Sequence, residues 1–138
     1  MKYLGLDLGS RTLGIATSDA TGLIASTYKT IRHNEEYDRL LLEVKEIIEE
    51  LKIDEVVLGF PKNMNNTIGP KGELSLEFKE KLEKLVTVPV HLQDERLTTK
   101  SATDMLIMGN VSRKDRKKVV DSVAATIILQ TFLDRKRN

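Results

Sequence analysis

The sequence predicts an α/β fold with one mixed five-stranded sheet and helices on both of its faces. Three strand-like segments come first, and the turns between them are so short that neighbouring strands must run antiparallel. Helical segments then alternate with two apolar strand segments, an order typical of parallel strands joined by right-handed crossovers. We therefore expect the first strand to lie centrally, beside the fourth.

The three antiparallel strands end at turn-forming residues such as glycine and aspartate. We predict them at residues 2–8, 13–18 and 23–32. In the first strand, Leu4, Leu6 and Leu8 alternate with residues of the opposite face, which include Gly5 and Asp7. A glycine inside a strand indicates that backbone or ligand must come close, and a carboxylate in so apolar a run needs compensation.

An amphipathic helix follows the third strand. Its apolar residues recur at spacings of three and four up to Leu51, and Asn34 is the predicted N-cap. Parallel strands are then expected at residues 55–60 and 88–93, with a second amphipathic helix between them. The second of these strands should lie at an edge of the sheet, because Pro89 cannot donate a ladder hydrogen bond.

The remaining chain is predicted as a short helix that stops at Gly109, a basic loop at residues 110–116 and a last helix over about residues 117–135. The apolar side of this last helix should pack on the sheet, and Asp121 lies on that side. The polar segment at residues 62–72 follows a buried strand and is long enough to indicate a functional loop.

The composition is that of one compact domain spanning residues 1–138, which we expect to be cytoplasmic. Cysteine is absent, as is common in a reducing compartment. No apolar run approaches the roughly 20 residues of a membrane span, so no membrane association is expected. The net charge of +1 does not by itself predict a polyanionic partner, so the distribution of charge is more informative than its sum.

Three acidic residues occur where an open α/β sheet binds its ligands, at the carboxyl ends of the strands. Asp7 lies near the end of the first strand, Glu95 follows the fifth, and Asp121 is on the inward side of the last helix. If they converge, a divalent cation must offset their repulsion, and oxygen-only ligands favour Mg²⁺ or Mn²⁺. Two such ions about 4 Å apart can activate a water and stabilise the leaving oxygen of a phosphodiester.

Each carboxylate also has a structural explanation. The alternatives are a turn cap for Asp7, an ion pair with Arg96 for Glu95, and an ion pair with Lys117 or Lys118 for Asp121. Asp94 is an alternative third ligand because it adjoins Glu95. His33 and His91 are too isolated in the sequence to be proposed as ligands or bases.

A cationic approach surface is predicted beside these carboxylates, because basic residues gather around the last loop. Their expected role is to steer phosphate groups, although a run of charge often only solvates a loop. The candidate nucleic-acid contacts are Lys62, Asn63, Arg96, Arg113, Lys114, Arg116, Lys117 and Lys118.

Four blocks of the sequence resemble the YqgF/RuvX family. They are residues 4–14 (LGLDLGSRTLG), 57–65 (VLGFPKNMN), 94–99 (DERLTT) and 121–125 (DSVAA). The blocks keep their order across nearly the whole chain, so their combination is specific. The resemblance implies an RNase H-like fold and a metal-dependent nuclease, assigned to maturation of the 16S ribosomal RNA 5′ end and also described as a Holliday junction resolvase. It places the acidic triad on Asp7, Glu95 and Asp121.

Two positions differ from patterns that are common in related proteins. Many RNase H-like nucleases carry an acidic residue at the end of the fourth strand, where this chain, like the family, has Gly59, Phe60 and Pro61. Glu95 must then reach across from the neighbouring strand, and adjacent strands are about 4.8 Å apart. Asn66 stands where the family loop usually has glycine, and asparagine is the next-best residue at positive φ.

These features predict a metal-dependent hydrolase of structured nucleic acid, with the 5′ end of pre-16S rRNA as the preferred substrate. Three alternatives stay open. A Holliday junction resolvase would act on branched DNA and would need a homodimer. An ATPase-like domain would need a second domain to close around ATP, and a non-catalytic ribosome-assembly factor would bind RNA without cleaving it.

Overall fold

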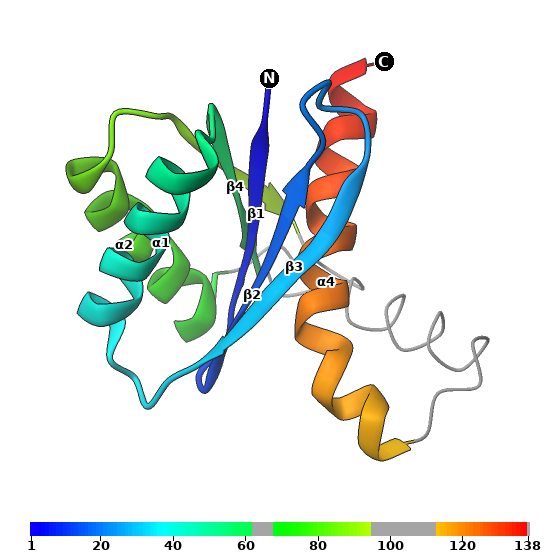
Figure 1. Ribbon diagram of the computed structural model, residues 1–138. Helices are drawn as coiled ribbons and strands as arrows, with labels where there is room; N and C mark the ends of the chain where they lie inside the picture. Colours follow the sequence, from blue (N-terminus) through cyan, green and yellow to red (C-terminus); the bar gives the residue numbers. More distant parts are fainter. Residues whose placement is uncertain (62–67, 95–112, 138) are drawn as a thin grey trace.

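The computed structural model describes residues 1–61, 68–94 and 113–137, with the side chains of the last segment from residue 123 to residue 136. Within these residues the strands form a five-stranded sheet in the order β3-β2-β1-β4-β5 (Figure 1). This order confirms that the first strand is central and lies beside the fourth.

The first three strands form an antiparallel meander, as predicted. They are β1 (Tyr3–Leu8), β2 (Thr12–Ser18) and β3 (Ala25–Arg32). β3 begins two residues later than predicted because the Asp19 carboxylate accepts hydrogen bonds from the N–H groups of Leu23 and Ile24, at 2.9 and 3.1 Å. These two residues therefore belong to the turn rather than to the ladder.

The other two strands run parallel to β1. β4 (Glu55–Phe60) pairs with β1, and β5 (Val90–Asp94) pairs with β4 at the edge of the sheet. The edge position predicted for the strand near Pro89 is confirmed, although the strand begins one residue after the proline. The carbonyl of Pro89 accepts a hydrogen bond from the N–H of Val56 at 3.0 Å, so the proline joins the sheet without an N–H of its own.

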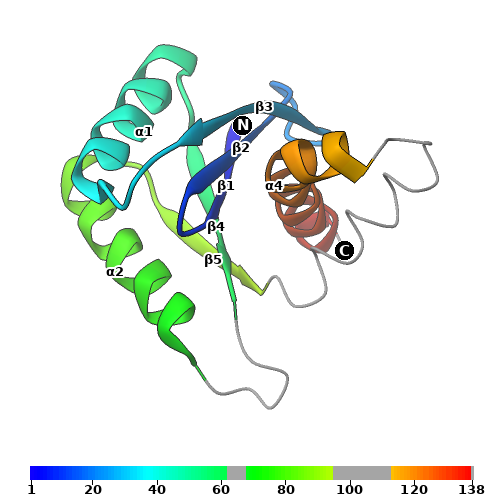
Figure 2. The ribbon, with the colours of Figure 1, turned by 90° about the horizontal axis from the view of Figure 1, so that it is seen from below.

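Helices cover both faces of the sheet, as predicted. α1 (Tyr37–Leu51) and α2 (Pro70–Leu85) lie on one face and α4 (Arg113–Arg137) lies on the other (Figure 2). The short helix predicted to stop at Gly109 lies outside the described residues. None of the helices in the described segments combines the length and the hydropathy needed to cross a bilayer.

The sheet separates two apolar clusters. Leu4, Leu6 and Leu8 pack with residues of α1 and α2. Tyr3, from the opposite face of the same strand, packs with Leu129 and other apolar residues of α4. The predicted alternation along β1 is therefore confirmed, and the face that carries Asp7 is the one that α4 covers.

Two predicted helix starts are wrong. α1 begins at Tyr37 with Glu36 as N-cap, because the side-chain oxygen of Asn34 accepts a hydrogen bond from Arg11 instead of capping the helix. α4 begins at Arg113, four residues before the predicted start. Arginine and lysine favour helix, so much of the predicted basic loop continues the helix.

The C-terminal end of α1 offers a test of local stability. Lys52 caps this helix in the left-handed region, with φ 56° and ψ 52°, where a side chain is strained and glycine is not. We expect Lys52→Gly to raise the free energy of unfolding by about 1 kcal/mol in urea denaturation. Lys45→Gly, within the same helix, should lower it by about 1 kcal/mol, and equal effects of the two changes would contradict this account.

Candidate active site

Asp7 lies near the carboxyl end of the central strand. Its side chain is half-buried, between the buried Leu6 and Leu8, and its backbone pairs with Gly14 of β2. The turn that follows is closed by a hydrogen bond of 2.8 Å from the N–H of Gly9 to the carbonyl of Thr12. The strand and this turn together hold the carboxylate at the end of the sheet where α/β proteins bind ligands.

α4 packs against β1 with almost no space between them. A Cβ added at Gly5 would lie 2.8 Å from the Cβ of Leu129 and 3.1 Å from the carbonyl oxygen of Ala125. The glycine of this strand therefore serves a close approach of backbone rather than of a ligand. Because Tyr3 packs on Phe132, with ring centroids 6.0 Å apart, α4 runs antiparallel to β1.

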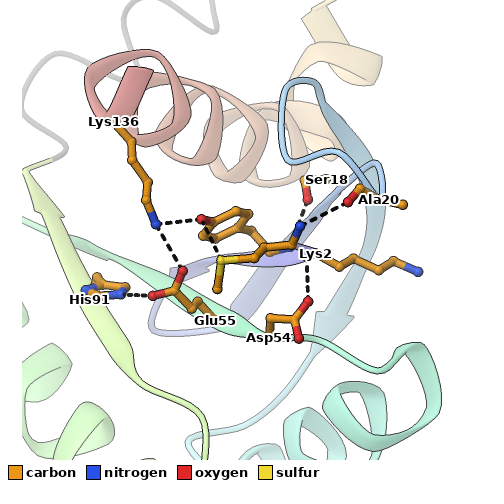
Figure 3. A network of polar contacts seen from close by, with 9 residues as sticks. Lys2, Ser18, Ala20, Asp54, Glu55, His91 and Lys136 are labelled. Carbon is orange, nitrogen blue, oxygen red and sulfur yellow. Dashed lines mark hydrogen bonds and ion pairs between the residues drawn. The ribbon is translucent and has the colours of Figure 1, made fainter. Parts of the chain in front are cut away.

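A polar network joins the C-terminal end of α4 to the starts of the strands (Figure 3). Glu55 of β4 is at its centre, with a side chain that is only 11% exposed. Its two carboxylate oxygens contact Nε2 of His91 at 2.8 Å and Nζ of Lys136 at 3.1 Å. Lys136 also donates to the hydroxyl of Tyr3 at 2.6 Å, and Phe132 stacks on His91 with centroids 5.2 Å apart.

The network changes the acidity of its members. Burial raises the pKa of Glu55, but the hydrogen bonds of His91 and Lys136 to its carboxylate outweigh this effect, so the pKa lies below its ordinary value. The Tyr3 hydroxyl and Glu55 raise the pKa of Lys136 in return. The charge of Glu55 is thus compensated by side chains of the protein, which indicates a structural role.

The predicted acidic triad is described in part. Asp7 lies at the carboxyl end of β1, and Asp121 belongs to α4, one turn before Ala125. The side chain of Asp121 and the whole of Glu95, which follows the last residue of β5, lie outside what the structure describes. Among the described side chains, no group of three His, Cys, Asp or Glu residues could hold a metal ion.

Some of the predicted nucleic-acid contacts lie within the described residues and others do not. Lys62, Asn63 and Arg96 lie outside the described residues. The whole basic run occupies the start of α4: Arg113, Lys114 and Arg116, predicted in a loop, belong to the helix together with Lys117 and Lys118, which were predicted at its start. The run therefore has helical spacing, which the sequence pattern did not indicate.

Three residues that were not predicted as site residues, Arg11, His33 and Asn34, lie in or next to the turn after Asp7. The backbone N–H of His33 donates to the carbonyl of Arg11 at 2.9 Å, and the guanidinium of Arg11 donates to Asn34. The turn and the segment between β3 and α1 are therefore connected at the same end of the sheet as Asp7. The sequence offered only an isolated histidine in a polar segment, and its partners cannot be read from sequence spacing.

Solved structures share this architecture. RuvC of T. thermophilus in complex with a Holliday junction substrate aligns over 100% of this chain and 97% of its own, with a TM-score of 0.64 and 17% identity. The fowlpox virus Holliday junction resolvase aligns over 98% and 99%, with a TM-score of 0.58 and 12% identity. The fold is therefore RNase H-like, with an acidic residue at the end of its central strand.

The chain belongs to the RuvX family, described as "Holliday junction resolvase", whose model matches residues 1–135. A relative from Bacillus subtilis (strain 168), named "Putative pre-16S rRNA nuclease", is 54% identical over 135 residues, which are 97% of this chain and 98% of the relative. A relative with the same name from Geobacillus sp. (strain WCH70) is 50% identical over 138 residues, 99% and 100% of the two chains. The family is one of nucleases, which hydrolyse phosphodiester bonds.

The Glu55 network predicts a defined pH dependence of stability. Folding lowers the pKa of Glu55 from an ordinary value of 4.5. The contribution of its charge to the free energy of unfolding is therefore present at neutral pH and is lost as the pH falls below that value. We expect Glu55→Gln to lower the free energy of unfolding at neutral pH by roughly 1–3 kcal/mol, a loss that shrinks in acid. Urea denaturation of wild type and Glu55→Gln at several pH values measures this difference in the free energy of unfolding.

The matched control for Glu55→Gln is Glu83→Gln. Glu83 pairs with Lys79 at 2.8 Å on the surface of α2, where its side chain is 42% exposed, so its loss should leave stability nearly unchanged. If the difference in free energy of unfolding between wild type and Glu55→Gln stayed constant down to acid pH, the charge of Glu55 would not contribute to stability as inferred.

The contact between β1 and α4 predicts the effect of a single methyl group. In Gly5→Ala the new Cβ must displace the backbone of α4 near Ala125, because the neighbouring atoms are not the ends of flexible side chains. We expect a loss of about 1–3 kcal/mol in the free energy of unfolding and a loss of nuclease activity in the variant that remains folded. Wild-type stability in Gly5→Ala would contradict the close packing.

Proposed function

We propose that this protein is a divalent-metal-dependent nuclease that processes the 5′ end of pre-16S rRNA, with Asp7, Glu95 and Asp121 as its metal ligands. The observation that carries the proposal is the position of Asp7, a half-buried carboxylate at the carboxyl end of the central strand, on the face that α4 covers. The names of the relatives from Bacillus and Geobacillus supply the substrate.

The register between α4 and β1 supports Asp121 as the partner of Asp7. Phe132 packs on Tyr3, and Leu129 and Ala125 pack on Gly5. Four residues of helix advance about 6 Å, and two residues of strand advance about 6.6 Å. Each step of two residues along β1 therefore corresponds to about four residues, or one turn, along α4. The same register, extended toward Asp7, brings the helix turn of residues 121–125 level with strand position 7, and Asp121 begins this turn.

The donors fit a hard divalent cation. Asp7 supplies a half-buried carboxylate on the face of the sheet that α4 covers, and a bound cation would stabilise its charged form. With three carboxylates as the donor set and no histidine or cysteine among them, Mg²⁺ or Mn²⁺ fits better than zinc. Such ions, when bound, activate a water and stabilise the leaving oxygen of the phosphodiester. The protein's part is to hold the carboxylates at the correct spacing and to orient the RNA.

The basic start of α4 suits the approach of a phosphate backbone. Lys117 and Arg113 precede Asp121 by one and two helical turns, so these cations are carried by the same rigid element as the proposed ligand. Contacts of this kind position a nucleic acid without reading its sequence, as expected for an enzyme that recognises RNA structure in the cytoplasm, where ribosomes are assembled. Lys62, Asn63 and Arg96 complete the proposed contact set.

A second candidate is resolution of Holliday junctions, which the description of the family favours. Cleavage of both strands of a junction needs two active sites, so this function includes a homodimer. Parallel assays on a pre-16S rRNA 5′ leader and on a four-way DNA junction, with the mass of the protein in solution measured alongside, distinguish the two substrates.

The test of the proposed site is Asp7→Asn, which keeps the size of the side chain and removes its charge. We expect cleavage of the RNA leader in Mg²⁺ or Mn²⁺ to fall about 100-fold or more, because metal-ion catalysis contributes several kcal/mol and each 1.36 kcal/mol is a factor of ten. Chelation of the metal should stop wild-type cleavage in the same assay.

The control is Asp38→Asn, which removes a carboxylate from the exposed first turn of α1 and should leave cleavage unchanged. Urea denaturation of both variants shows that they are folded. Full activity of a folded Asp7→Asn protein would reject the site, and binding of the leader by wild type without cleavage in any divalent metal would indicate a non-catalytic assembly factor.

A further inference from the structure

The segment between β3 and α1 lies against the turn that follows Asp7. His33 is the central residue of this contact and is only 7% exposed. Its backbone N–H donates to the carbonyl of Arg11 at 2.9 Å, and its ring atom Nε2 lies 3.0 Å from the carbonyl oxygen of Gly9. One residue therefore holds two carbonyls of the same turn.

The contacts define the tautomer of His33. Its ring atom Nδ1 lies 3.0 Å from the backbone nitrogen of Glu35, which carries a hydrogen, so Nδ1 must be the acceptor. The ring proton is then on Nε2, from which it donates to the carbonyl of Gly9. The ring of Tyr37 packs at a centroid distance of 5.4 Å and limits the rotation of the imidazole.

The held turn begins two residues after Asp7. The N–H of Gly9 closes the turn and its carbonyl bonds to His33, so both backbone groups of this residue have partners. Only Leu8, a buried residue, separates Gly9 from Asp7. Any movement of the Gly9 peptide is therefore transmitted to the end of β1 that carries the carboxylate.

We propose that His33 is a positioning residue of the active site, which fixes the Gly9 peptide and through it the orientation of the Asp7 carboxylate toward the metal ion. This role rests on the proposed function of Asp7. Residues that orient metal ligands without touching the ion typically change metal affinity 10–100-fold when they are replaced, and an indirect tether should fall at about the lower limit.

Two conservative replacements separate the two ring contacts. Asparagine has a side-chain oxygen near the position of Nδ1, so His33→Asn keeps an acceptor for the N–H of Glu35 and loses the reach to Gly9. Glutamine extends its amide N–H groups toward the position of Nε2, so His33→Gln keeps the donor to Gly9 and loses the acceptor. If the contact with Gly9 positions Asp7, Mn²⁺ affinity should fall in His33→Asn and be retained in His33→Gln.

The experiment measures Mn²⁺ affinity by calorimetry and cleavage of the RNA leader across a series of Mn²⁺ concentrations, for wild type, both His33 variants, Asp7→Asn and Asp38→Asn. We expect the Mn²⁺ dissociation constant to rise about 10-fold in His33→Asn and to stay within about 3-fold of wild type in His33→Gln and Asp38→Asn. Cleavage should follow the same order at low Mn²⁺ and converge at saturating Mn²⁺.

Equal Mn²⁺ affinities in the two His33 variants, with Asp7→Asn inactive, would overturn the positioning role and leave the proposed function standing. Full affinity and activity in Asp7→Asn would overturn the proposed function and the positioning role together. Should His33→Asn fail to fold, His33→Gln still decides the matter, since a 10-fold loss of Mn²⁺ affinity in that folded variant would show that the Gly9 donor is not what positions the carboxylate.

Discussion

A side chain at position 5 would have no room, because an added Cβ would lie 2.8 Å from Leu129 and 3.1 Å from the backbone of Ala125. The contact brings the backbone of α4 close to the middle of the central strand and sets the register between them. The relative position of Asp7 and of the proposed groups on α4 depends on this register. The helix carries Asp121 and the basic run, the strand carries Asp7, and their separation is fixed by a residue that has no side chain.

On the face of the sheet that α4 covers, the acidic side chains at the two ends of the strands have different surroundings. At the start of the strands, Glu55 is nearly buried and its charge is balanced by Lys136 and by hydrogen bonding to His91, so that end contributes stability. At the carboxyl ends, Asp7 is half-buried beside a turn that the β3–α1 segment holds. α4 and β1 both connect the two ends, since Lys136 of the network belongs to α4 and Tyr3 begins the strand that carries Asp7.

Much of this architecture could be predicted from the sequence, because turn lengths and residue periodicity are local properties. Strand order, the central position of β1 and the faces of Leu4 and Asp7 followed from them. Gly5 could be recognised as a position of close approach, but its partners Ala125 and Leu129 are 120 and 124 residues away in the chain, and no local pattern identifies them. Asn34 was misread because its competing partner, Arg11, belongs to another strand turn. The role of His33 could not be predicted because its ring binds the backbone carbonyl of Gly9 and the backbone N–H of Glu35, and sequence spacing does not identify such partners.

The Glu55 network also bears on the order in which the molecule assembles. Lys136 bonds to Tyr3 and Glu55, which precede it by 133 and 81 residues. Contacts so remote along the chain close the largest loops and therefore form late, after the hairpins and the β1–β4 crossover have reduced the distances involved. We therefore expect α4 to dock late in folding. Since α4 carries Asp121 and β1 carries Asp7, a chain whose last helix has not docked lacks the proposed metal site.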